Sequence, residues 1–191
     1  MDTLKSKILE KLEQEPIIAA VNKLEKIDLA IKSPCQSIFL LTGSIYNLKE
    51  IIDKVKEANM YIYVHIDLIE GFSKDKVALK YISEKMRPDG IITTKGTLVR
   101  KAKSMNICAI QRLFLLDSLS LDTGIDSVYS TKPNAIEVMP GIIPRMITKI
   151  RNQTNLPVIA GGLIDRKQDV IECLKAGAVG ISTSNERIWH M

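Results

Sequence analysis

The sequence has few cysteines, and their spacing limits what they can do. Cys35, Cys108 and Cys173 are odd in number, and no two of them form a CxxC pair. Cys108 also lies within an apolar run typical of a buried strand. This usage argues against a disulfide framework, because such frameworks use an even number of closely spaced cysteines. We therefore expect free thiols in a protein of a reducing compartment.

Long apolar runs and aromatic clusters are also missing. The N-terminal segment MDTLKSKILEKLEQE alternates charged with apolar residues, so it is neither a signal peptide nor a membrane span. We expect a cytoplasmic protein with no membrane partner, in which residues 1–15 form an N-terminal helix. Aromatic residues make up only 5% of the chain. No aromatic RNP motif, GxxG clamp or zinc knuckle is present, so no standard RNA-recognition signature appears.

The charge excess is small and positive. There are 27 basic and 22 acidic residues, a net charge of +5, and the pI is about 9.0. Such an excess permits binding to a polyanion without requiring it. The run VRKAK (Val99–Lys103) and the N-terminal Lys5, Lys7 and Lys11 are basic. Runs of this kind are typical of solvated helix faces, so charge alone does not predict a nucleic-acid partner.

Length and composition fit one domain. The 191 residues are 46% apolar with a mean hydropathy of +0.06, enough for a substantial core. No linker or low-complexity segment divides the chain, so we expect residues 1–191 to form a single domain. A protein of this length needs short helices and loops to close a barrel of eight units.

Short apolar or β-branched runs recur along the whole chain, and helix-compatible sequence follows the first seven. This alternation predicts parallel strands covered by helices. Eight such units favour a compact, single-domain α/β fold of the TIM-type (β/α)8 barrel class, with an open doubly wound sheet as the alternative. The predicted strands are residues 16–21, 37–43, 61–68, 90–95, 106–114, 135–141, 157–162 and 178–183.

Two of the intervening segments show clear helical periodicity. Residues 47–59 place Leu48, Ile51, Ile52 and Val55 on one side and charges on the other. Residues 166–177 repeat this with Val170, Ile171 and Leu174, and Gly177 is a natural C-terminal stop. These two segments should pack against the strands.

The last quarter of the sequence carries the main candidate for a binding site. One strand ends in Gly161 and Gly162, and the next ends in Ser182, Thr183 and Ser184. Glycines and hydroxyls with free backbone N–H groups form a nest for phosphate, and in a barrel this nest follows strands 7 and 8. The alternative is that the glycines only allow close packing of strand and helix. The combination favours a phosphorylated small molecule.

A second set of polar residues lies near the end of the predicted strand at 61–68. Alternation places His65 and Asp67 on one face of the sheet, and Glu70 follows just past the strand end. An imidazole and two carboxylates can share protons or bind ligand hydroxyls, and Asp67 with Glu70 can bind a divalent cation. A lone histidine in a strand is usually part of the core, and this is the alternative here, but the flanking acids favour a site role for His65. No metal site is predicted firmly.

Three further charged residues stand at strand ends. Lys95 could form a Schiff base or meet a phosphate, or it could be a solvated lysine that opens the next helix. Arg112 and Glu137 lie in apolar strands, where a charge needs a partner or must face the site. We expect them to contact the ligand, and a buried pair between them is the structural alternative.

The motifs together resemble one known family. They are FLLTGSI, VHIDLIEG, DGIITTKGTLVRKAK, QRLFLLDS, IEVMPGIIP, VIAGGLI and GISTSNERIW, in this order between about Ile17 and Trp189. This pattern closely resembles the glycerol-3-phosphate-responsive antiterminators, regulators of bacterial glycerol uptake operons. The resemblance covers nearly the whole chain.

The resemblance implies a sensor, not a catalyst. Such a protein is a TIM-type barrel that needs no cofactor, binds glycerol 3-phosphate, and then binds the leader mRNA of a glycerol operon to prevent a terminator hairpin. We assign the phosphate to Gly161, Gly162 and the 182–184 hydroxyls, and the glycerol hydroxyls to residues such as Asp67, Glu70 or Lys95. Ordering of the loops after strands 7 and 8 would couple the two ligands.

Two other functions remain open at this stage. One is a barrel aldolase, isomerase or phosphodiesterase that acts on a small phosphorylated substrate through Lys95, His65, Asp67 and Glu70. The other is a metabolite sensor with no RNA partner. The chain ends soon after Trp189, which leaves a very short eighth helix, so we expect the last barrel segment to be covered by the N-terminal helix or by a partner subunit in a homodimer.

Overall fold

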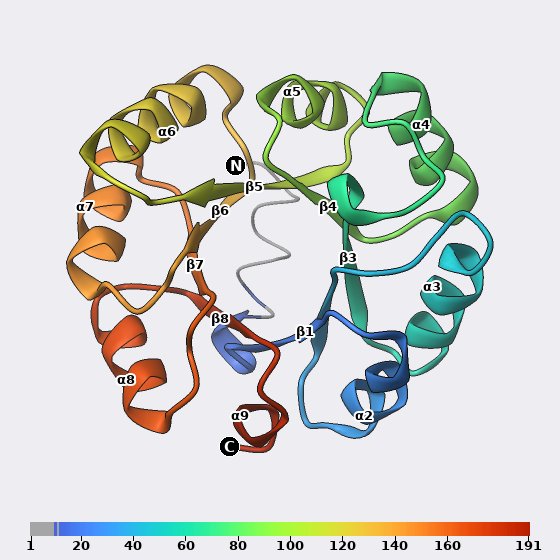
Figure 1. The fold of residues 1–191 in the computed structure, drawn as a ribbon, viewed down its shortest axis with the longest axis horizontal. Coiled ribbons are helices and arrows are strands. Elements are labelled where there is room, and N and C mark those ends of the chain that lie inside the picture. The colour runs from blue at the N-terminus through green and yellow to red at the C-terminus, as the bar shows by residue number, and fades with distance from the viewer. Residues whose placement is uncertain (1–9, 11) are drawn as a thin grey trace.

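The strands and helices alternate along the chain and close into one barrel (Figure 1). A computed structural model describes residues 10 and 12–191, in which all eight strands pair in parallel in the order β1 to β8, with β8 returning to β1. The predicted barrel is confirmed. The strands are β1 (Ile17–Val21), β2 (Ser37–Leu40), β3 (Tyr61–His65), β4 (Gly90–Thr93), β5 (Cys108–Phe114), β6 (Ala135–Met139), β7 (Val158–Gly161) and β8 (Gly180–Thr183).

Helices cover the outside of the barrel, and most are short, as the chain length requires. The helix predicted for residues 1–15 lies mostly outside the described residues. Within that range, the described residues 10 and 12–14 are helical. Within the described residues no helix is long and apolar enough to cross a membrane. The helices are α2 (Ile27–Lys32), α3 (Leu48–Glu57), α4 (Lys76–Tyr81), α5 (Gly96–Ser104), α6 (Ser118–Thr131), α7 (Pro144–Thr154), α8 (Lys167–Lys175) and α9 (Glu186–Trp189), with 3-10 turns η1 (Leu24–Lys26) and η2 (Ile66–Leu68) and a π-helical turn η3 (Ile82–Met86).

The buried face was predicted correctly for α3 and only in part for α8. In α3, Leu48, Ile51, Ile52 and Val55 are all buried, as predicted. In α8, Val170 is buried together with Cys173, whereas Ile171 and Leu174 are only half-buried. Gly177 adopts φ +98° just after α8, which is the left-handed turn expected of a C-terminal glycine.

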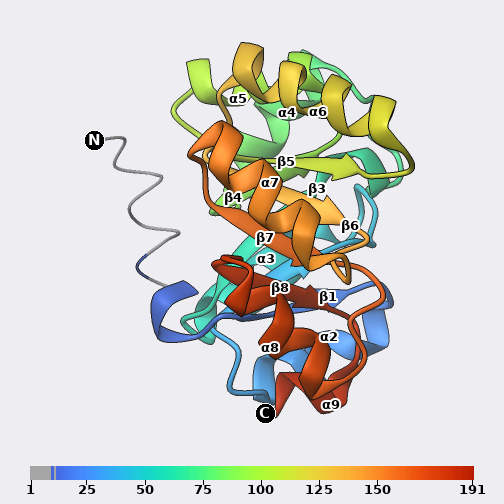
Figure 2. The ribbon, with the colours of Figure 1, turned by 90° about the vertical axis from the view of Figure 1, so that its left-hand side faces the viewer.

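Two apolar layers hold the barrel together. One lies between the strands and the outer helices, and the other fills the barrel interior with residues such as Ile18, Phe39 and Tyr63. Leu12 belongs to the interior cluster and packs near Gly180 at the start of β8, so it closes the amino-terminal end. The strands run away from this end (Figure 2), and their carboxyl ends form the opposite, polar mouth.

The last unit is closed by α9, which has only four residues. Its Trp189 is 1% exposed and donates from Nε1 to the Thr183 carbonyl at 2.7 Å. In this unit one buried indole therefore covers barrel surface that a longer helix covers in the other seven units.

Replacing this indole should destabilise the protein strongly. Trp189→Ala removes the largest fully buried side chain of the described residues and its hydrogen bond to the Thr183 carbonyl, so we expect a loss of about 4 kcal/mol in the free energy of unfolding. Urea denaturation measures this loss. Tyr46→Ala serves as the control because Tyr46 is 95% exposed, and it should change stability by less than about 0.5 kcal/mol. Similar stabilities of the two variants would contradict the role assigned to α9.

Candidate functional site

The candidate site lies at the carboxyl ends of the strands, around a cavity of about 200 Å³. Its walls come from the ends of β1, β2, β5 and β6 and from the segments that follow β7 and β8. The cavity brings together six of the residues predicted from sequence. These are Arg112, Glu137, Gly162, Ser182, Thr183 and Ser184.

The floor of the cavity is a buried ion pair. Arg112 and Glu137 face each other across β5 and β6, and Arg112 Nε lies 2.7 Å from Glu137 Oε2. The two side chains are 6% and 1% exposed. The structural alternative considered for these residues is therefore present, and the same pair also lines the cavity.

This ion pair is incomplete. Arg112 Nη2 and Glu137 Oε1 are buried and have no hydrogen-bond partner among the described residues, and the same holds for His65 Nδ1. Buried polar atoms are normally paired, because an unpaired one loses its hydrogen bonds to water without replacement. A donor and an acceptor at the edge of a polar cavity are thus available to a ligand.

Gly161 makes room for this carboxylate. A Cβ at position 161 would lie 2.8 Å from Glu137 Oε1. The sequence suggested that Gly161 binds phosphate or allows close packing of strand and helix. In the structure its lack of a side chain instead leaves space for the ion pair.

Gly162 and Leu163 form an unusual turn at the rim. Their φ values are +75° and +59°, so two consecutive residues are left-handed. This conformation is costly for a bulky residue such as Leu163, which is also 66% exposed. The hydrogen bonds of the described residues leave the N–H groups of Gly162 and Leu163 without an acceptor. Free N–H groups in such a turn can form an anion nest.

The serine and threonine of β8 have different environments. Ser182 is buried beside the cavity, and within the described residues its hydroxyl has no partner. The hydroxyl of Thr183 instead donates to the Ile164 carbonyl at 2.8 Å and accepts from the Asn185 N–H. Ser184 is exposed at the rim. Ser182 is therefore available to a ligand, whereas Thr183 holds the loop.

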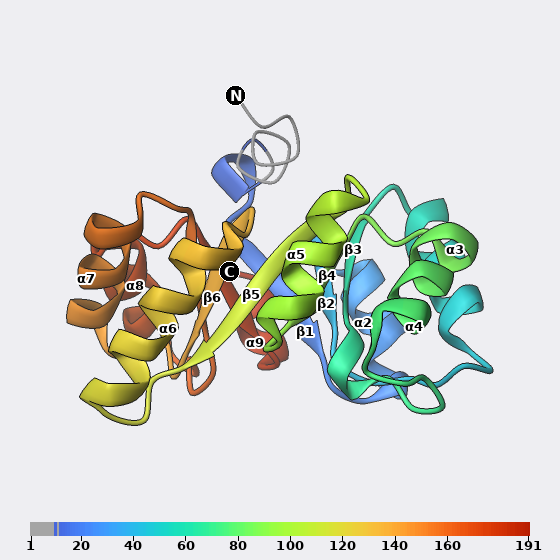
Figure 3. The same ribbon diagram turned by 90° about the horizontal axis from the view of Figure 1, so that it is seen from above.

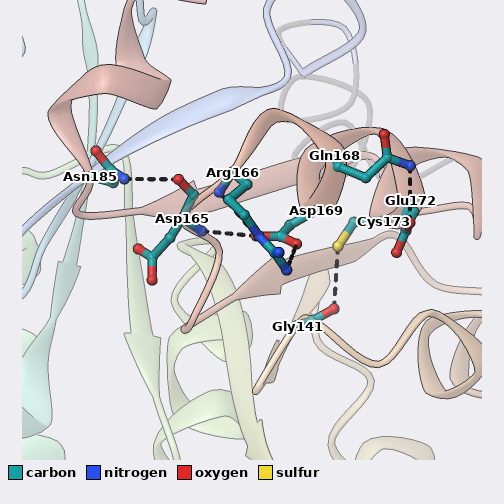
Figure 4. Close-up of polar contacts among 8 residues, drawn as sticks. All are labelled: Gly141, Asp165, Arg166, Gln168, Asp169, Glu172, Cys173 and Asn185. Carbon is teal, nitrogen blue, oxygen red and sulfur yellow. Dashed lines mark hydrogen bonds and ion pairs between the residues drawn. The ribbon is translucent and has the colours of Figure 1, made fainter.

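The segments after β7 and β8 are joined to each other (Figure 4). Asn185 Nδ2 donates to the Asp165 carbonyl at 3.1 Å, in addition to the Thr183–Ile164 bond. Asp169 accepts from the backbone N–H groups of Asp165 and Arg166 and pairs with the Arg166 guanidinium. Burial raises the pKa of Asp169, but these hydrogen bonds outweigh it and hold the pKa below its usual value. The two segments thus form one pre-arranged wall.

Cys173 supports the same wall from behind. It is fully buried in α8 and lies 3.3 Å from the Gly141 carbonyl, to which its thiol donates (Figure 4). Burial raises its pKa to about 11, so the thiol stays protonated and unreactive near neutral pH. All three cysteines are buried, and none of them forms a disulfide.

The predicted set at His65, Asp67 and Glu70 does not form one site. The prediction that strand alternation places His65 and Asp67 on one face is wrong, because β3 ends at His65 and the next three residues form the turn η2. Asp67 instead accepts from the hydroxyls of Thr93 and Thr94 and from the Thr94 N–H. Glu70 is exposed. Within the described part of the chain, no three His, Cys, Asp or Glu side chains converge as a metal site would require.

Lys95 lies outside the cavity as well. It is the residue before α5, its side chain is exposed, and its Nζ donates to the Lys74 carbonyl at 3.1 Å. This is the environment of the solvated lysine considered above. Sequence reasoning missed two polar cavity residues, Asn22 and Asp165, which lie in the segments after β1 and β7.

His65 is held neutral. Burial is the main cause, and the nearby Arg112 charge adds to it, so the pKa of His65 falls from 6.5 to about 4. At a pH between these two pKa values, His65 is protonated in the unfolded chain and neutral in the folded protein. Stability is thus lost as the pH falls from about 6.5 toward 4.

This linkage predicts a measurable effect of one substitution. Between pH 7 and pH 4 the wild-type protein should lose about 3 kcal/mol more unfolding free energy than His65→Gln, because the variant lacks the titrating group. Urea denaturation across this pH range gives the comparison. His190→Gln, at an exposed histidine, should follow the wild-type curve. Parallel curves for His65→Gln and wild type would contradict the assignment.

The ion pair makes a second prediction about stability. Glu137→Leu leaves Arg112 charged and unpaired in the interior, which should cost about 3–5 kcal/mol. The double variant Arg112→Met/Glu137→Leu removes both charges and should recover most of that loss. Urea denaturation of the three proteins tests this. A double variant as unstable as the single one would mean that the pair is retained for stability.

The fold and the site define a class: a (β/α)8-barrel protein with a small polar cavity at the carboxyl ends of its strands. A family model described as glycerol-3-phosphate responsive antiterminator matches residues 17–189. The chain belongs to this family, as the sequence motifs indicated.

Several individual proteins are similar to this chain over nearly its whole length. The chain is 36% identical over 184 residues to the uncharacterized protein YgcP of Escherichia coli K12, covering 96% of both chains. A solved structure of a glycerol uptake operon antiterminator regulatory protein from Listeria monocytogenes superposes with a TM-score of 0.89 at 31% identity, covering 92% of this chain and 95% of that one. An antiterminator-related protein from Thermotoga maritima gives 0.82 at 32% identity, covering 92% and 98%.

More distant structures share the fold alone. An archaeal fructose-1,6-bisphosphate aldolase superposes with a TM-score of 0.70, covering 97% of this chain and 92% of that one, but only 11% of residues are identical. The barrel is therefore common to this chain and to aldolases.

Proposed function

We propose that this protein is a glycerol-3-phosphate sensor that binds the leader mRNA of a glycerol operon and prevents early termination. The observation that carries the ligand half is the unpaired donor and acceptor, Arg112 Nη2 and Glu137 Oε1, beside a polar cavity. The family match supports glycerol 3-phosphate as the ligand and RNA as the partner.

The phosphate is assigned to the wall after β7 and β8. It would accept from the free N–H groups of Gly162 and Leu163 and from the hydroxyls of Ser182 and Ser184. Thr183 would act indirectly, because its hydroxyl already holds the Ile164 carbonyl. Gly161 would act indirectly too, by leaving space for Glu137.

The glycerol hydroxyls are assigned to the ion pair. A hydroxyl can accept from Arg112 Nη2 and donate to Glu137 Oε1, which pairs both orphaned atoms. The carboxylate of Asp165 lines the same cavity and offers a further acceptor. This replaces the assignment to Asp67, Glu70 and Lys95, none of which lines the cavity. A volume of about 200 Å³ suits a ligand smaller than those of drug-sized pockets, which measure about 300–1,000 Å³.

A sensor is favoured over an aldolase by the residues at the cavity. No lysine is among the described residues that line it, so a Schiff base there has no amine. Isomerase chemistry needs a base in contact with the substrate carbon, whereas in this binding mode Glu137 holds Arg112 through Oε2 and a ligand hydroxyl through Oε1. The side chains that line the cavity are thus better suited to binding a ligand than to converting it into a product.

Calorimetric titration with glycerol 3-phosphate tests the ligand, with glycerol and inorganic phosphate as controls. Binding should be selective, and it should tighten when leader RNA is present, because coupling between two ligands is reciprocal. Equal affinity with and without RNA would remove the antiterminator mechanism and leave a sensor with no RNA partner. Turnover of the ligand during the titration would favour an enzyme.

One substitution tests the phosphate assignment without disturbing the fold. Ser182→Ala removes a hydroxyl that has no partner in the described structure, so stability should stay within about 0.5 kcal/mol while affinity for glycerol 3-phosphate falls roughly tenfold. Ser37→Ala is the matched control, since Ser37 is also a buried strand serine but lies at the opposite end of the barrel. Equal ligand affinity of the two variants would reject the assignment.

A further inference from the structure

The positive charge of this protein is concentrated in one segment. Residues 74–103 contain nine Lys or Arg and three Asp or Glu, a net charge of +6. The other 161 residues contain 18 basic and 19 acidic residues, a net charge of −1. The whole excess of the chain thus comes from about a sixth of its length.

The fold gathers this segment on one side of the barrel. It forms α4, η3, β4 and α5, and α4 packs against α5 (Figures 1 and 3). The Lys95 Nζ contact with the Lys74 carbonyl ties the starts of the two helices together. Seven basic side chains of the segment are exposed, and we call six of them, without Arg87, the basic face: Lys74, Lys76, Lys80, Lys85, Lys95 and Arg100.

The acidic residues of the segment do little to neutralise this face. Asp75 accepts from the backbone N–H groups of Val77 and Ala78 as the cap of α4. Asp89 pairs with Lys56, from outside the segment, at 3.6 Å. Two members of the basic face have an acidic neighbour within the segment: Glu84 meets Lys80 in a solvent-exposed contact 3.9 Å long, and Asp75 lies near enough to Lys95 to interact with its charge. The face therefore presents cations to solvent.

A second cavity lies next to the basic face. Its volume is about 510 Å³, and it lies between the ends of β4 and β5 and helix α6. Thr94 lines it and is the neighbour of Lys95 in the chain. The ring of Phe114, half exposed at the end of β5, forms one wall, and hydroxyls of α6 such as Ser120 and Thr123 form another.

We propose that the basic face and this cavity together form the RNA-binding surface. The lysines and Arg100 bind the phosphate backbone, and an unstacked base enters the cavity against Phe114. Single-stranded RNA is recognised in this way elsewhere, through cations along the backbone and aromatic rings under the bases. The Thr123 hydroxyl and the Asp117 carboxylate in the cavity match the edge of a base and not a phosphate. The inference rests on the proposed function, since it locates the partner named there.

Arg112 connects this surface to the ligand. It lines both the cavity at Phe114 and the cavity above Glu137, so one guanidinium borders both sites. A ligand hydroxyl on Nη2 would fix this group and thereby shape the wall of the RNA cavity. Differential affinity for the two states is what coupling requires.

The test compares two triple variants in RNA binding. Lys76→Gln/Lys80→Gln/Arg100→Gln removes three charges of the basic face, and Lys149→Gln/Lys167→Gln/Lys175→Gln removes three exposed charges from α7 and α8 on the other side. Affinities for glycerol-operon leader RNA and for a short oligouridine are measured at several salt concentrations with glycerol 3-phosphate present. Calorimetry with glycerol 3-phosphate alone monitors the ligand site.

The basic-face variant should bind both RNAs at least tenfold more weakly, and its dependence of log affinity on log salt should be shallower by about 2. The α7–α8 variant should keep the wild-type slope, and all proteins should bind glycerol 3-phosphate equally. Phe114→Leu should weaken RNA binding roughly tenfold without changing the slope, since it removes stacking and no charge.

Different results overturn different claims. If wild type binds RNA and the basic-face variant binds as tightly with the same slope, this surface is wrong and the proposed function stands. If the two triple variants lose RNA affinity equally, RNA is attracted by the net charge of the protein and not by this surface, which would also reject the proposal. If wild type binds glycerol 3-phosphate but neither RNA, the RNA half of the proposed function fails, and this inference fails with it.

Discussion

The buried pair of Arg112 and Glu137 is the constraint on which the site depends. Two charges in a barrel interior lose their water, and a single hydrogen bond between them recovers only part of that cost. The pair shapes its surroundings: a Cβ at position 161 would lie 2.8 Å from Oε1 and would displace it, and the Arg112 charge helps to keep His65 neutral. An ion pair that leaves one donor and one acceptor unpaired is better explained by a ligand that completes it than by stability.

The walls around this pair are already in place without a ligand. Asn185 and Thr183 join the segment after β8 to the segment after β7, and Asp169 holds the start of α8. The sequence suggested that phosphate couples ligand and RNA binding by ordering these loops. Loops that are already held in place suit this role less well than Arg112, which borders two cavities and could move between them. A ligand shifts an equilibrium only if it binds one state more tightly, and a side chain between two sites can provide that difference.

Much of the fold could be predicted from the sequence, because its signals are local. Eight apolar runs mark the eight strands, and the periodicity of α3 gave its buried face correctly. The site was predicted less completely, since its details depend on where strands end. Extending β3 to Asp67 gave the wrong face, because the turn η2 begins directly after His65. The pairing of Arg112 with Glu137 depends on the register of β5 and β6, which no local pattern fixes, so both interpretations stayed open. The basic face was not located because charge counts do not say which basic side chains of residues 74–103 share one side, and the packing of α4 against α5 decides that.

The most direct test of this account is a crystal structure of the protein with glycerol 3-phosphate. The account predicts the phosphate within hydrogen-bond distance of Ser182 and of the Gly162 and Leu163 N–H groups, and a glycerol hydroxyl between Arg112 Nη2 and Glu137 Oε1. A ligand bound elsewhere, for example in the cavity beside Phe114, with the Arg112–Glu137 pair still lacking a partner, would contradict it.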